Sequence, residues 1–487
     1  MVVGETTLLL ETDARSGIAR EVGEVFVLAI AWSADEPSRV GEVAVVPSGT
    51  PHVLGRGEGE SGEPRVAFHR QRPGIFAACP GLAGAGLSRR QLLVSAEGDG
   101  LDVERVGQCE MRINGRQAEK GRLKPGDTLY LRRQLLLLCV RRAPLIPSGR
   151  YPVASWGEFG ELDAHGILGE SPATWRLRER IVFTAKSKTH ALLLGPSGTG
   201  KELAARAIHA MSNAGSKPFV ARNAATLPAG LIDAELFGSA RNYPNAGMPE
   251  RQGLVGQVDG GTLFLDEIAE LPLEQQAHLL RVLDAGGEYQ RLGESVTRRS
   301  DFRLVGATNR DPSILKHDLR ARLTSLVELT PLAARREDCP LLARHLLLRA
   351  SAQSPEIAGR FVTRDAAGRA SPRFSPRFVD YILHQELPSN VRELDAILWK
   401  AISEAPDSEL LAPAEWKPER ASSPSSAPPA ATPPPSEPSA DDLRAALASV
   451  GNSVGKAARV LGLPNRFALY RLMKKHGIGD KSSEPEG

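Results

Sequence analysis

The sequence has 487 residues, which is too long for one hydrophobic core and predicts about three domains. Hydrophobic residues make up 41% and charged residues 24%, and the longest apolar run, residues 135–140, is too short for a transmembrane helix, which needs ~20 apolar residues. The net charge of +3 excludes a uniformly basic surface, so any affinity for nucleic acid requires a local patch. Four scattered cysteines and an N-terminus without a signal peptide predict a cytoplasmic protein with reduced thiols.

Residues 20–142 form the first predicted domain. Short apolar runs such as VAVVP, HVLGRG and LDVERVG alternate there with turn residues, which is typical of an all-β sandwich. Three loop motifs follow in order: LGRG with Arg56, LSRRQ with Ser88 and Arg89, and ING with Asn114. In this order they resemble the motifs of the forkhead-associated (FHA) domain, a sandwich that binds phosphothreonine peptides.

The FHA resemblance implies a phosphopeptide site built from these loops. Arg56 would bind the phosphate through its guanidinium, with Ser88 as a hydroxyl donor and Arg89 beside it. Asn114 would bond to the peptide backbone. Gln91 stands where the family carries a histidine that braces the loops. The alternative is a sandwich that serves only as a docking surface.

A Gly- and Pro-rich stretch, residues 143–166, predicts a linker. Residues 167–336 follow, in which strand-like runs (ALLLG, TLFLDE, RLVGATN) alternate with helical ones, and this alternation predicts an α/β domain with a parallel sheet. Residues 337–406 are expected to form a mostly helical lid.

The strongest motif is HALLLGPSGTGKELAARAIH, in which an apolar strand enters a glycine-rich turn and leaves into a helix. Such a loop turns its backbone N–H groups towards phosphates, with the helix N-terminus behind them and a lysine reaching the β- and γ-phosphates. The Ser or Thr that usually follows the lysine is replaced by glutamate. The predicted ATP-binding residues of this loop are Gly195, Pro196, Ser197, Gly198, Thr199, Gly200, Lys201 and Glu202.

A second motif, GGTLFLDEI, places Asp266 and Glu267 at the end of an apolar strand. Two carboxylates at this position can hold Mg²⁺, with Asp266 as the metal residue, and can polarise an attacking water. The pair could instead cap the next helix, but the glycine loop favours a site for ATP and Mg²⁺.

The glycine loop, PFVARNAATL, ELFG, GGTLFLDEIAELPLEQQAHLLRVL, ATNRD and NVREL together resemble the AAA+ domain of bacterial enhancer-binding proteins, the sigma-54-dependent activators. The resemblance covers about 240 residues, in the family's order. It implies that Glu267 is the catalytic glutamate and Asn223 its polar switch partner. It also implies that Asn309 and Arg392 sense the γ-phosphate, and the family likewise carries glutamate at the position of Glu202.

The same resemblance implies a homo-oligomer, a hexameric ring or a dimer, in which a neighbouring subunit supplies two arginine fingers. LKHDLRARL keeps the second finger as Arg322 but has Lys316 in place of the first, and the segment from Asn309 to Lys316 is several residues short. Lysine keeps the charge and loses the bidentate fork. Because a trans-acting arginine contributes ~10³ or more in rate, we expect slow hydrolysis that depends on self-association.

In the family, ELFG precedes a loop whose Phe and Thr touch sigma-54. The positions counted from ELFG are Asn242, Tyr243, Pro244 and Asn245, so proline replaces the contact Phe and asparagine the contact Thr. Proline fixes its own φ and restricts the residue before it, which predicts weakened or lost contact with sigma-54 RNA polymerase. The alternative is that Tyr243 supplies the aromatic contact one residue earlier.

Residues 407–440 are rich in Pro and Ser and predict a mobile tether. Residues 441–480 show three helical segments with Gly462-Leu463-Pro464 as a turn, and seven Lys or Arg between 441 and 478 make the local basic patch. The segment resembles the Fis-type helix-turn-helix, an all-α DNA-binding domain, although a solvated basic helix is the alternative. The predicted DNA-contacting residues are Asn465, Arg466, Arg471, Lys474 and Lys475.

These elements predict a multidomain regulator: an FHA-like sandwich that binds a phosphothreonine-containing protein, an AAA+ ATPase, and a DNA reader at upstream sites. Its expected function is that of a sigma-54 activator. One alternative is a DNA-bound regulator that does not engage sigma-54 and uses ATP only to set its oligomeric state. A second is a phosphopeptide-binding scaffold with a vestigial ATPase.

Overall fold

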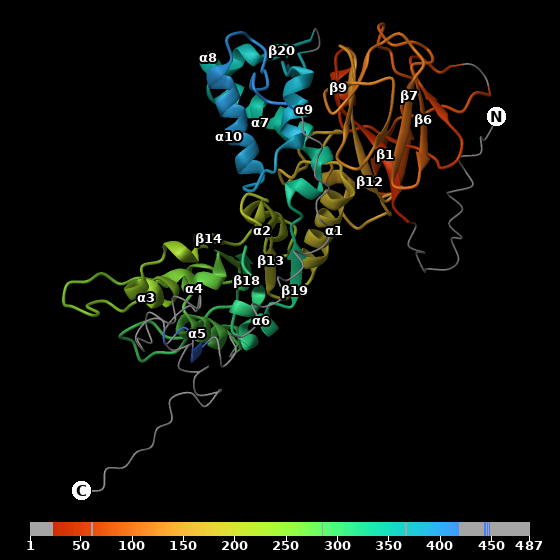
Figure 1. The fold of residues 1–487 in the computed structure, drawn as a ribbon. Coiled ribbons are helices and arrows are strands. Elements are labelled where there is room, and N and C mark those ends of the chain that lie inside the picture. Colours follow the sequence, from red (N-terminus) through yellow and green to blue (C-terminus); the bar gives the residue numbers. More distant parts are fainter. Residues whose placement is uncertain are drawn as a thin grey trace, which may run out of the picture. The chain divides into compact units, whose positions relative to one another are not determined.

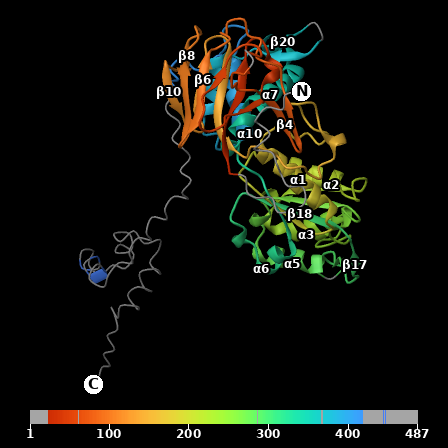
Figure 2. The ribbon, with the colours of Figure 1, turned by 90° about the vertical axis from the view of Figure 1, so that its right-hand side faces the viewer.

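The computed structural model describes residues 23–59, 62–284, 286–365 and 368–417, together with positions 443, 444, 446 and 448. The long ranges contain a β-rich region, a parallel α/β region and a helical region (Figures 1 and 2). The four isolated positions are helical. The predicted DNA-contacting residues Asn465, Arg466, Arg471, Lys474 and Lys475 lie outside the described residues.

The N-terminal region consists of two antiparallel sheets around a common apolar core, as the alternating pattern predicts. One sheet has the order β5-β4-β2-β1-β12-β11-β8-β9 and the other the order β10-β7-β6-β3. The strands are β1 (Val25–Ser33), β2 (Val43–Val45), β3 (His52–Leu54), β4 (His69–Arg72), β5 (Ile75–Ala78), β6 (Leu92–Glu97), β7 (Gly100–Arg105), β8 (Met111–Ile113), β9 (Arg116–Gln117), β10 (Lys120–Leu123), β11 (Thr128–Leu131) and β12 (Leu135–Arg142).

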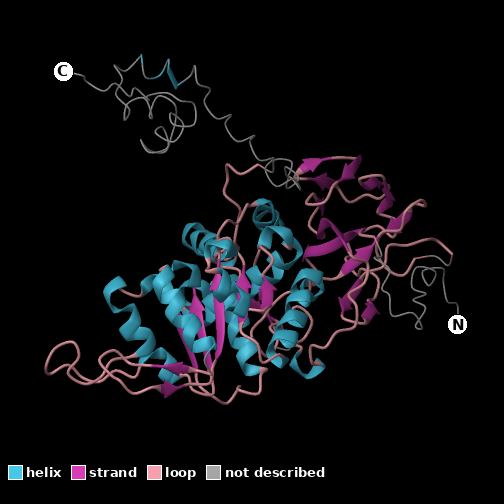
Figure 3. Ribbon diagram, turned by 90° about the horizontal axis from the view of Figure 1, so that it is seen from below, coloured by secondary structure: helices cyan, strands magenta, loops and turns pink. Residues whose placement is uncertain are grey.

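The central region is a five-stranded parallel sheet of order β14-β15-β18-β13-β19 with helices on its faces (Figure 3). The predicted strands ALLLG, TLFLDE and RLVGATN are β13, β15 and β18. Because all five strands are parallel, their carboxyl ends meet at one edge, where ligands bind in such sheets. The strands are β13 (Ala191–Leu194), β14 (Phe219–Asn223), β15 (Thr262–Asp266), β18 (Arg303–Thr308) and β19 (Ser325–Glu328). The helices are α1 (Pro172–Lys186), α2 (Lys201–Ala210), α3 (Ile232–Phe237), α4 (Gly253–Gln257), α5 (Leu273–Asp284) and α6 (His317–Arg322), and a hairpin is formed by β16 (Glu288–Tyr289) and β17 (Arg298–Arg299).

The region expected to be a helical lid is mostly helical, but it also contains a hairpin that the sequence did not predict. Its helices are α7 (Cys339–Gln353), α8 (Pro355–Ala358), α9 (Pro376–His384) and α10 (Val391–Glu404), and its hairpin is β20 (Val362–Arg364) with β21 (Ala370–Pro372). The 3₁₀ turns within the described residues are η2 (Pro37–Arg39), η3 (Val153–Ser155), η4 (Ala224–Thr226), η5 (Ala229–Leu231), η6 (Ile268–Glu270), η7 (Pro312–Ile314), η8 (Leu332–Ala334), η9 (Arg336–Asp338) and η10 (Gly359–Phe361).

The stretch 143–166, predicted to be a linker from its Gly and Pro content, is packed against α1. Tyr151 is 3% exposed, and the ring of Trp156 lies edge-on to Trp175 with 4.9 Å between centroids. Aromatic side chains bury large apolar areas and find polar partners for their N–H and O–H groups. These anchors outweigh the turn-rich composition, so the stretch is part of the compact structure.

All four cysteines are free, as their spacing predicts. Cys139 and Cys339 are buried, and burial raises the pKa of the Cys339 thiol to about 12, which keeps it protonated at neutral pH. Within the described ranges, every helix is too short or too polar to cross a membrane.

Candidate nucleotide site

The glycine loop joins β13 to α2 in the strand–loop–helix order that the motif predicts. Gly198 and Gly200 have φ of +75° and +98°, in the left-handed region that favours glycine. A Cβ atom at Gly198 would also collide with the carbonyl oxygen of Ser389 in the lid. Glycine at this position therefore permits both the turn and the close approach of the lid.

Lys201, the first residue of α2, lies inside the curve of this loop. Its side chain is buried, and Nζ donates to the carbonyl oxygens of Gly195 at 2.9 Å and Pro196 at 3.4 Å. Thr199 Oγ1 closes the turn by donating to the Pro196 carbonyl at 2.8 Å. An ammonium group beside a helix N-terminus makes an anion-binding position.

The acidic pair lies across the site from this lysine loop. Asp266 ends β15, and the following residue, Glu267, has a φ of +50°, which is uncommon for a residue other than glycine. Its backbone N–H donates to Asp266 Oδ1 at 3.0 Å, and Glu267 Oε2 accepts from the backbone N–H of Asn309 at 3.4 Å. Local backbone strain of this kind is concentrated at functional sites.

Asn223 ends β14 in register with Asp266, but its side chain has a local role. Its Oδ1 accepts from Ala225 N–H at 2.9 Å and caps η4. The expected pairing with Glu267 is not formed among the described hydrogen bonds. The backbone N–H of Asn309 lies beside Glu267 in this structure, and the switch role of Asn223 stays a prediction.

The lid closes over the glycine loop. Arg392 Nη1 donates to Ser197 Oγ at 2.8 Å, and Asn390 Nδ2 donates to the Ser197 carbonyl at 2.8 Å. Val391 N–H donates to the Gly198 carbonyl at 3.2 Å. The predicted sensor arginine is therefore held directly above the loop by the start of α10.

A cavity of about 420 Å³ brings these groups together. It is lined by the loop residues 197–202 together with Asn223, Asp266, Glu267 and Arg392, which come from four separate motifs. Sequence reasoning missed two further parts of its wall. They are Leu162, Ile167 and Leu168 from the expected linker and start of the α/β region, and His345, Arg349 and Asp395 from the lid.

The carboxylates at the cavity fit the chemistry of Mg²⁺. This ion is usually held by one or two carboxylates together with phosphate oxygens, and it keeps several waters. Asp266 and Glu267 supply such oxygens at the cavity wall. Among the described residues there is no group of three or more His, Cys, Asp or Glu that would hold a metal without phosphates.

Neither predicted finger residue lines the cavity of its own chain. Lys316 precedes α6, and its backbone N–H donates to Gln276 Oε1 at 2.9 Å. Arg322 ends α6 and pairs with Asp284 Oδ1 at 2.5 Å, with its side chain 55% exposed. Arg322 is thus available at the surface.

The loop between α3 and α4 projects from the α/β region (Figure 1). Asn242 Oδ1 accepts from Gly247 N–H at 2.9 Å, which closes the tip, and Pro244 and Asn245 are exposed there. The ring of Tyr243 lies against Gly293 of the β16–β17 hairpin, where a Cβ atom would collide with it. The aromatic side chain is therefore turned towards the β16–β17 hairpin of the same chain.

The loops of the N-terminal sandwich are tied together around Arg56 and Ser88. Gln91 is fully buried; its Nε2 donates to the Cys109 carbonyl at 2.9 Å, and its Oε1 accepts from Ser88 N–H at 3.3 Å. Arg65 Nη2 donates to the carbonyls of Arg56 at 3.4 Å and Arg89 at 3.1 Å. Glutamine thus connects the loops at the position where the family carries histidine.

Asn114 is separated from this cluster by the strand β8. Its Nδ2 donates to Asp127 Oδ1 and its Oδ1 accepts from Thr128 N–H, both at 2.8 Å, and the residue is 9% exposed. Both polar atoms are used inside the fold, which does not support the predicted peptide contact. Gln108, which the sequence did not single out, lies beside Ser88 instead, since its N–H donates to Ser88 Oγ at 3.1 Å.

The parallel sheet, glycine loop, strand-end acidic pair and helical lid define a P-loop domain of the AAA+ type. The family described as the Sigma-54 interaction domain matches residues 167–331. The transcriptional regulatory protein ZraR of Escherichia coli K12 is 35% identical over 323 residues, which are 63% of this chain and 68% of ZraR. The chain belongs to the sigma-54 activator family of transcriptional regulators.

The chain also matches a second regulator and a solved structure. The Nif-specific regulatory protein of Bradyrhizobium diazoefficiens is 40% identical over 245 residues, which are 49% of this chain and 40% of that protein. The solved structure of NtrX from Brucella abortus in complex with ADP has 27% sequence identity and a TM-score of 0.45, and the match covers 64% of this chain and 70% of NtrX.

Proposed function

We propose that this protein is an ATP-dependent, DNA-binding transcriptional regulator that receives a phosphothreonine-containing partner at its N-terminal sandwich. The observation that carries the proposal is the single cavity in which Lys201, Asp266, Glu267 and Arg392 meet, although they are far apart in the sequence. Phosphate release from ATP by the purified protein tests this proposal. The wild type should release phosphate, and the Lys201→Ala variant should lose this activity.

Each group in the cavity has a role in hydrolysis of the β–γ bond. Lys201 and the N-terminus of α2 bind the phosphates, and Asp266 would hold Mg²⁺, which would supply positive charge beside the phosphates. Glu267 orients the attacking water, and its carboxylate is fixed by the N–H of Asn309. Arg392 approaches the γ-phosphate from the lid. Catalysis of this kind depends on positioning and electrostatic stabilisation.

We further propose that the site is completed by a second copy of the chain. Arg322 is exposed and lies outside its own cavity, so it can reach the cavity of a neighbour in a ring or dimer. Lys316 would stand beside it as a point charge without the guanidinium fork. ATP turnover is therefore expected to require self-association.

The output through sigma-54 is proposed to be weak. Pro244 and Asn245 are exposed at the loop tip, and Tyr243 is turned against Gly293, so none of them repeats the family's Phe-Thr contact. This geometry favours the second candidate function, a DNA-bound regulator that uses ATP to set its oligomeric state. The match to the Sigma-54 interaction domain favours the first.

Restoring the tip should separate these functions. The double variant Pro244→Phe/Asn245→Thr is expected to bind sigma-54 about tenfold or more tightly than the native loop in the presence of ADP and aluminium fluoride. Pro249→Phe is the matched control, because it adds an aromatic ring at another exposed proline of the same loop. Binding can be measured by fluorescence anisotropy of labelled sigma-54. Equal affinity of the native and restored tips would show that the native tip is already competent.

At the sandwich, Arg56, Ser88 and Arg89 are proposed to bind phosphothreonine, with Gln108 beside them. Gln91 and Arg65 hold the loops in place. Arg56→Ala is expected to weaken a phosphothreonine peptide about tenfold or more, because a charge-assisted hydrogen bond contributes about 1.5–3 kcal/mol. Isothermal titration calorimetry measures the change.

The control for this experiment is Arg141→Ala, which removes an arginine of β12 that faces Glu24. It should leave the peptide affinity unchanged. Equal binding by wild type and the Arg56 variant would instead favour a sandwich that serves as a docking surface without a phosphate site.

The C-terminal segment is proposed to hold the assembly on DNA, with Asn465, Arg466 and Arg471 at bases or phosphates and Lys474 and Lys475 at phosphates. ATP turnover also separates both regulatory functions from the remaining candidate, a phosphopeptide-binding scaffold whose ATPase is vestigial.

A further inference from the structure

The sandwich shares a hydrophobic core with the lid. Ala31, Leu136 and Leu138 from β1 and β12 belong to the same buried cluster as residues of α7 and α9. Three polar contacts join the same two regions: Trp32 Nε1 to the Phe374 carbonyl at 2.9 Å, Thr128 Oγ1 to Asp380 Oδ1 at 2.6 Å, and Arg142 Nη1 to Glu337 Oε2 at 2.7 Å. All six residues are buried or half-buried, so the sandwich is firmly attached to the lid.

Strand β4 of the sandwich binds the segment 157–170, which leads into the α/β region. Arg72, the last residue of β4, pairs with both oxygens of Glu170, at 2.5 and 3.2 Å. Its guanidinium also donates to the carbonyls of Gly157 and Glu158, each at 2.9 Å. A bidentate, largely buried guanidinium–carboxylate pair is among the stronger polar contacts in proteins.

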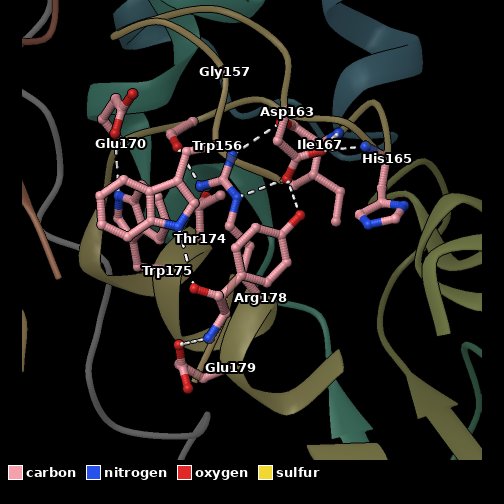
Figure 4. Close-up of polar contacts among 12 residues, drawn as sticks. Trp156, Gly157, Asp163, His165, Ile167, Glu170, Thr174, Trp175, Arg178 and Glu179 are labelled. Atoms are coloured by element: carbon pink, nitrogen blue, oxygen red, sulfur yellow. Dashed lines mark hydrogen bonds and ion pairs between the residues drawn. The ribbon is translucent and has the colours of Figure 1, made fainter. Parts of the chain in front are cut away.

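Glu170 is in turn fixed to α1 (Figure 4). Trp175 Nε1 donates to its Oε2 at 3.1 Å. On the same helix, Arg178 donates to the carbonyls of Ile167 at 2.9 Å and Gly169 at 2.8 Å. Ile167 and Leu168 line the cavity and lie three and two residues before Glu170. The ion pair between Arg72 and Glu170 therefore holds the segment that forms the α/β side of the cavity wall.

The chain passes from the α/β region to the lid near Asp338. The carboxylate of Asp338 accepts from the backbone N–H groups of Glu170 at 2.9 Å and Ser171 at 3.0 Å. That crossing connects the two walls of the cavity, as do the contacts of the lid with the glycine loop at Ser197 and Gly198. The sandwich adds a connection outside the cavity, because Arg72 holds the segment before α1 and Thr128 holds α9 of the lid. This added connection opposes a rotation of the lid about the crossing.

We propose that the N-terminal sandwich is a brace: it connects the α/β region to the lid, keeps the nucleotide cavity closed and slows nucleotide release. Arg72 and Thr128 are positioning residues at its two ends. The inference rests on the proposed binding of nucleotide in the cavity. Nucleotide release requires the two walls of the cavity to separate, one from the α/β region and one from the lid, which carries Leu342 and Arg392. Lid motions of this kind often limit turnover.

The dissociation rate of mant-ADP from the full-length protein, chased with excess ADP in a stopped-flow fluorimeter, tests the brace. Arg72→Gln should accelerate release about tenfold. Thr128→Val should accelerate it by a smaller factor, because the contacts of Trp32 and Arg142 with the lid remain. Arg122→Gln is the matched control, since Arg122 forms a two-bond pair with Asp102, both bonds at 2.7 Å, entirely within the sandwich. The control should release mant-ADP at the wild-type rate.

The double variant Arg72→Gln/Thr128→Val distinguishes a brace from two local effects. A brace is released when either end opens, so the double variant should release mant-ADP no faster than the faster single variant. Independent effects at separate sites would instead multiply. Wild-type rates in both single variants, or a multiplied rate in the double variant, would overturn the brace. A wild-type protein that fails to bind mant-ADP would overturn the nucleotide site itself, which is a separate result.

Discussion

Replacement of Lys201 by alanine is expected to abolish ATP binding and to lower ATP turnover by at least ~10²-fold, because loss of one preorganised donor at developing charge costs about 10²–10³ in rate. Lys201 is 7% exposed, and its ammonium group lies within the glycine loop, where no other lysine or arginine of the loop can replace it. Glycine loop and helix would remain, so folding should be preserved.

Phosphate release and titration with mant-ATP measure this effect. Lys186→Ala is the control, because Lys186 is an exposed lysine at the end of α1. Its turnover should equal that of the wild type. Wild-type turnover by the Lys201 variant would show that hydrolysis in the preparation arises elsewhere, and the proposed ATPase site would be wrong.

Replacement of Arg322 by alanine should give the second large effect, a loss of turnover of ~10³-fold with nearly unchanged ATP affinity. Turnover and ATP affinity separate because Arg322 is outside the cavity of its own chain, where its side chain pairs with Asp284 at the surface. It would act on the transition state in a neighbouring copy, so ground-state binding does not depend on it.

Arg320→Ala is the control for this prediction. Arg320 is exposed on the same short helix, α6, two residues away, and its replacement should leave turnover unchanged. Equal losses of turnover in both variants would indicate damage to α6. Full turnover by the Arg322 variant would show that Arg322 is not an arginine finger.

Much of the nucleotide site could be predicted from the sequence, because its motifs are short and each follows a strand of one parallel sheet. Residues 197–202 are contiguous, and Asn223, Asp266 and Asn309 each stand at or directly after the end of β14, β15 or β18. Parallel strands bring such positions to one edge. A reader of the sequence can therefore place them together without knowing the side-chain geometry.

The remaining wall could not be predicted, because its residues have no spacing that signals a site. His345 and Arg349 are on α7 among apolar residues, and Ile167 lies where Gly and Pro suggested a linker. Arg72 contacts Glu170 across 98 positions in the sequence. Such contacts depend on tertiary packing, which local composition does not encode.

At the sandwich, the structure ties the loops of Arg56, Ser88 and Arg89 together and leaves Asn114 apart from them. Gln91 connects the loops through its amide, which has a donor and an acceptor as histidine does. Asn114 matched a motif by type, yet the fold uses it to hold Asp127 and Thr128. The role of Asn114 at a peptide backbone therefore stays a prediction.

The central claim, that each ATPase site is built from the cavity of one copy and Arg322 of the next, is tested most directly by mixing two inactive variants. Lys201→Ala retains the arginine, and Arg322→Ala retains the cavity. Mixed assemblies should therefore recover ATP turnover well above that of either variant alone, up to about a quarter of the wild-type rate if copies pair at random. A mixture that stays as inactive as its components, although the two variants co-assemble, would contradict the shared site.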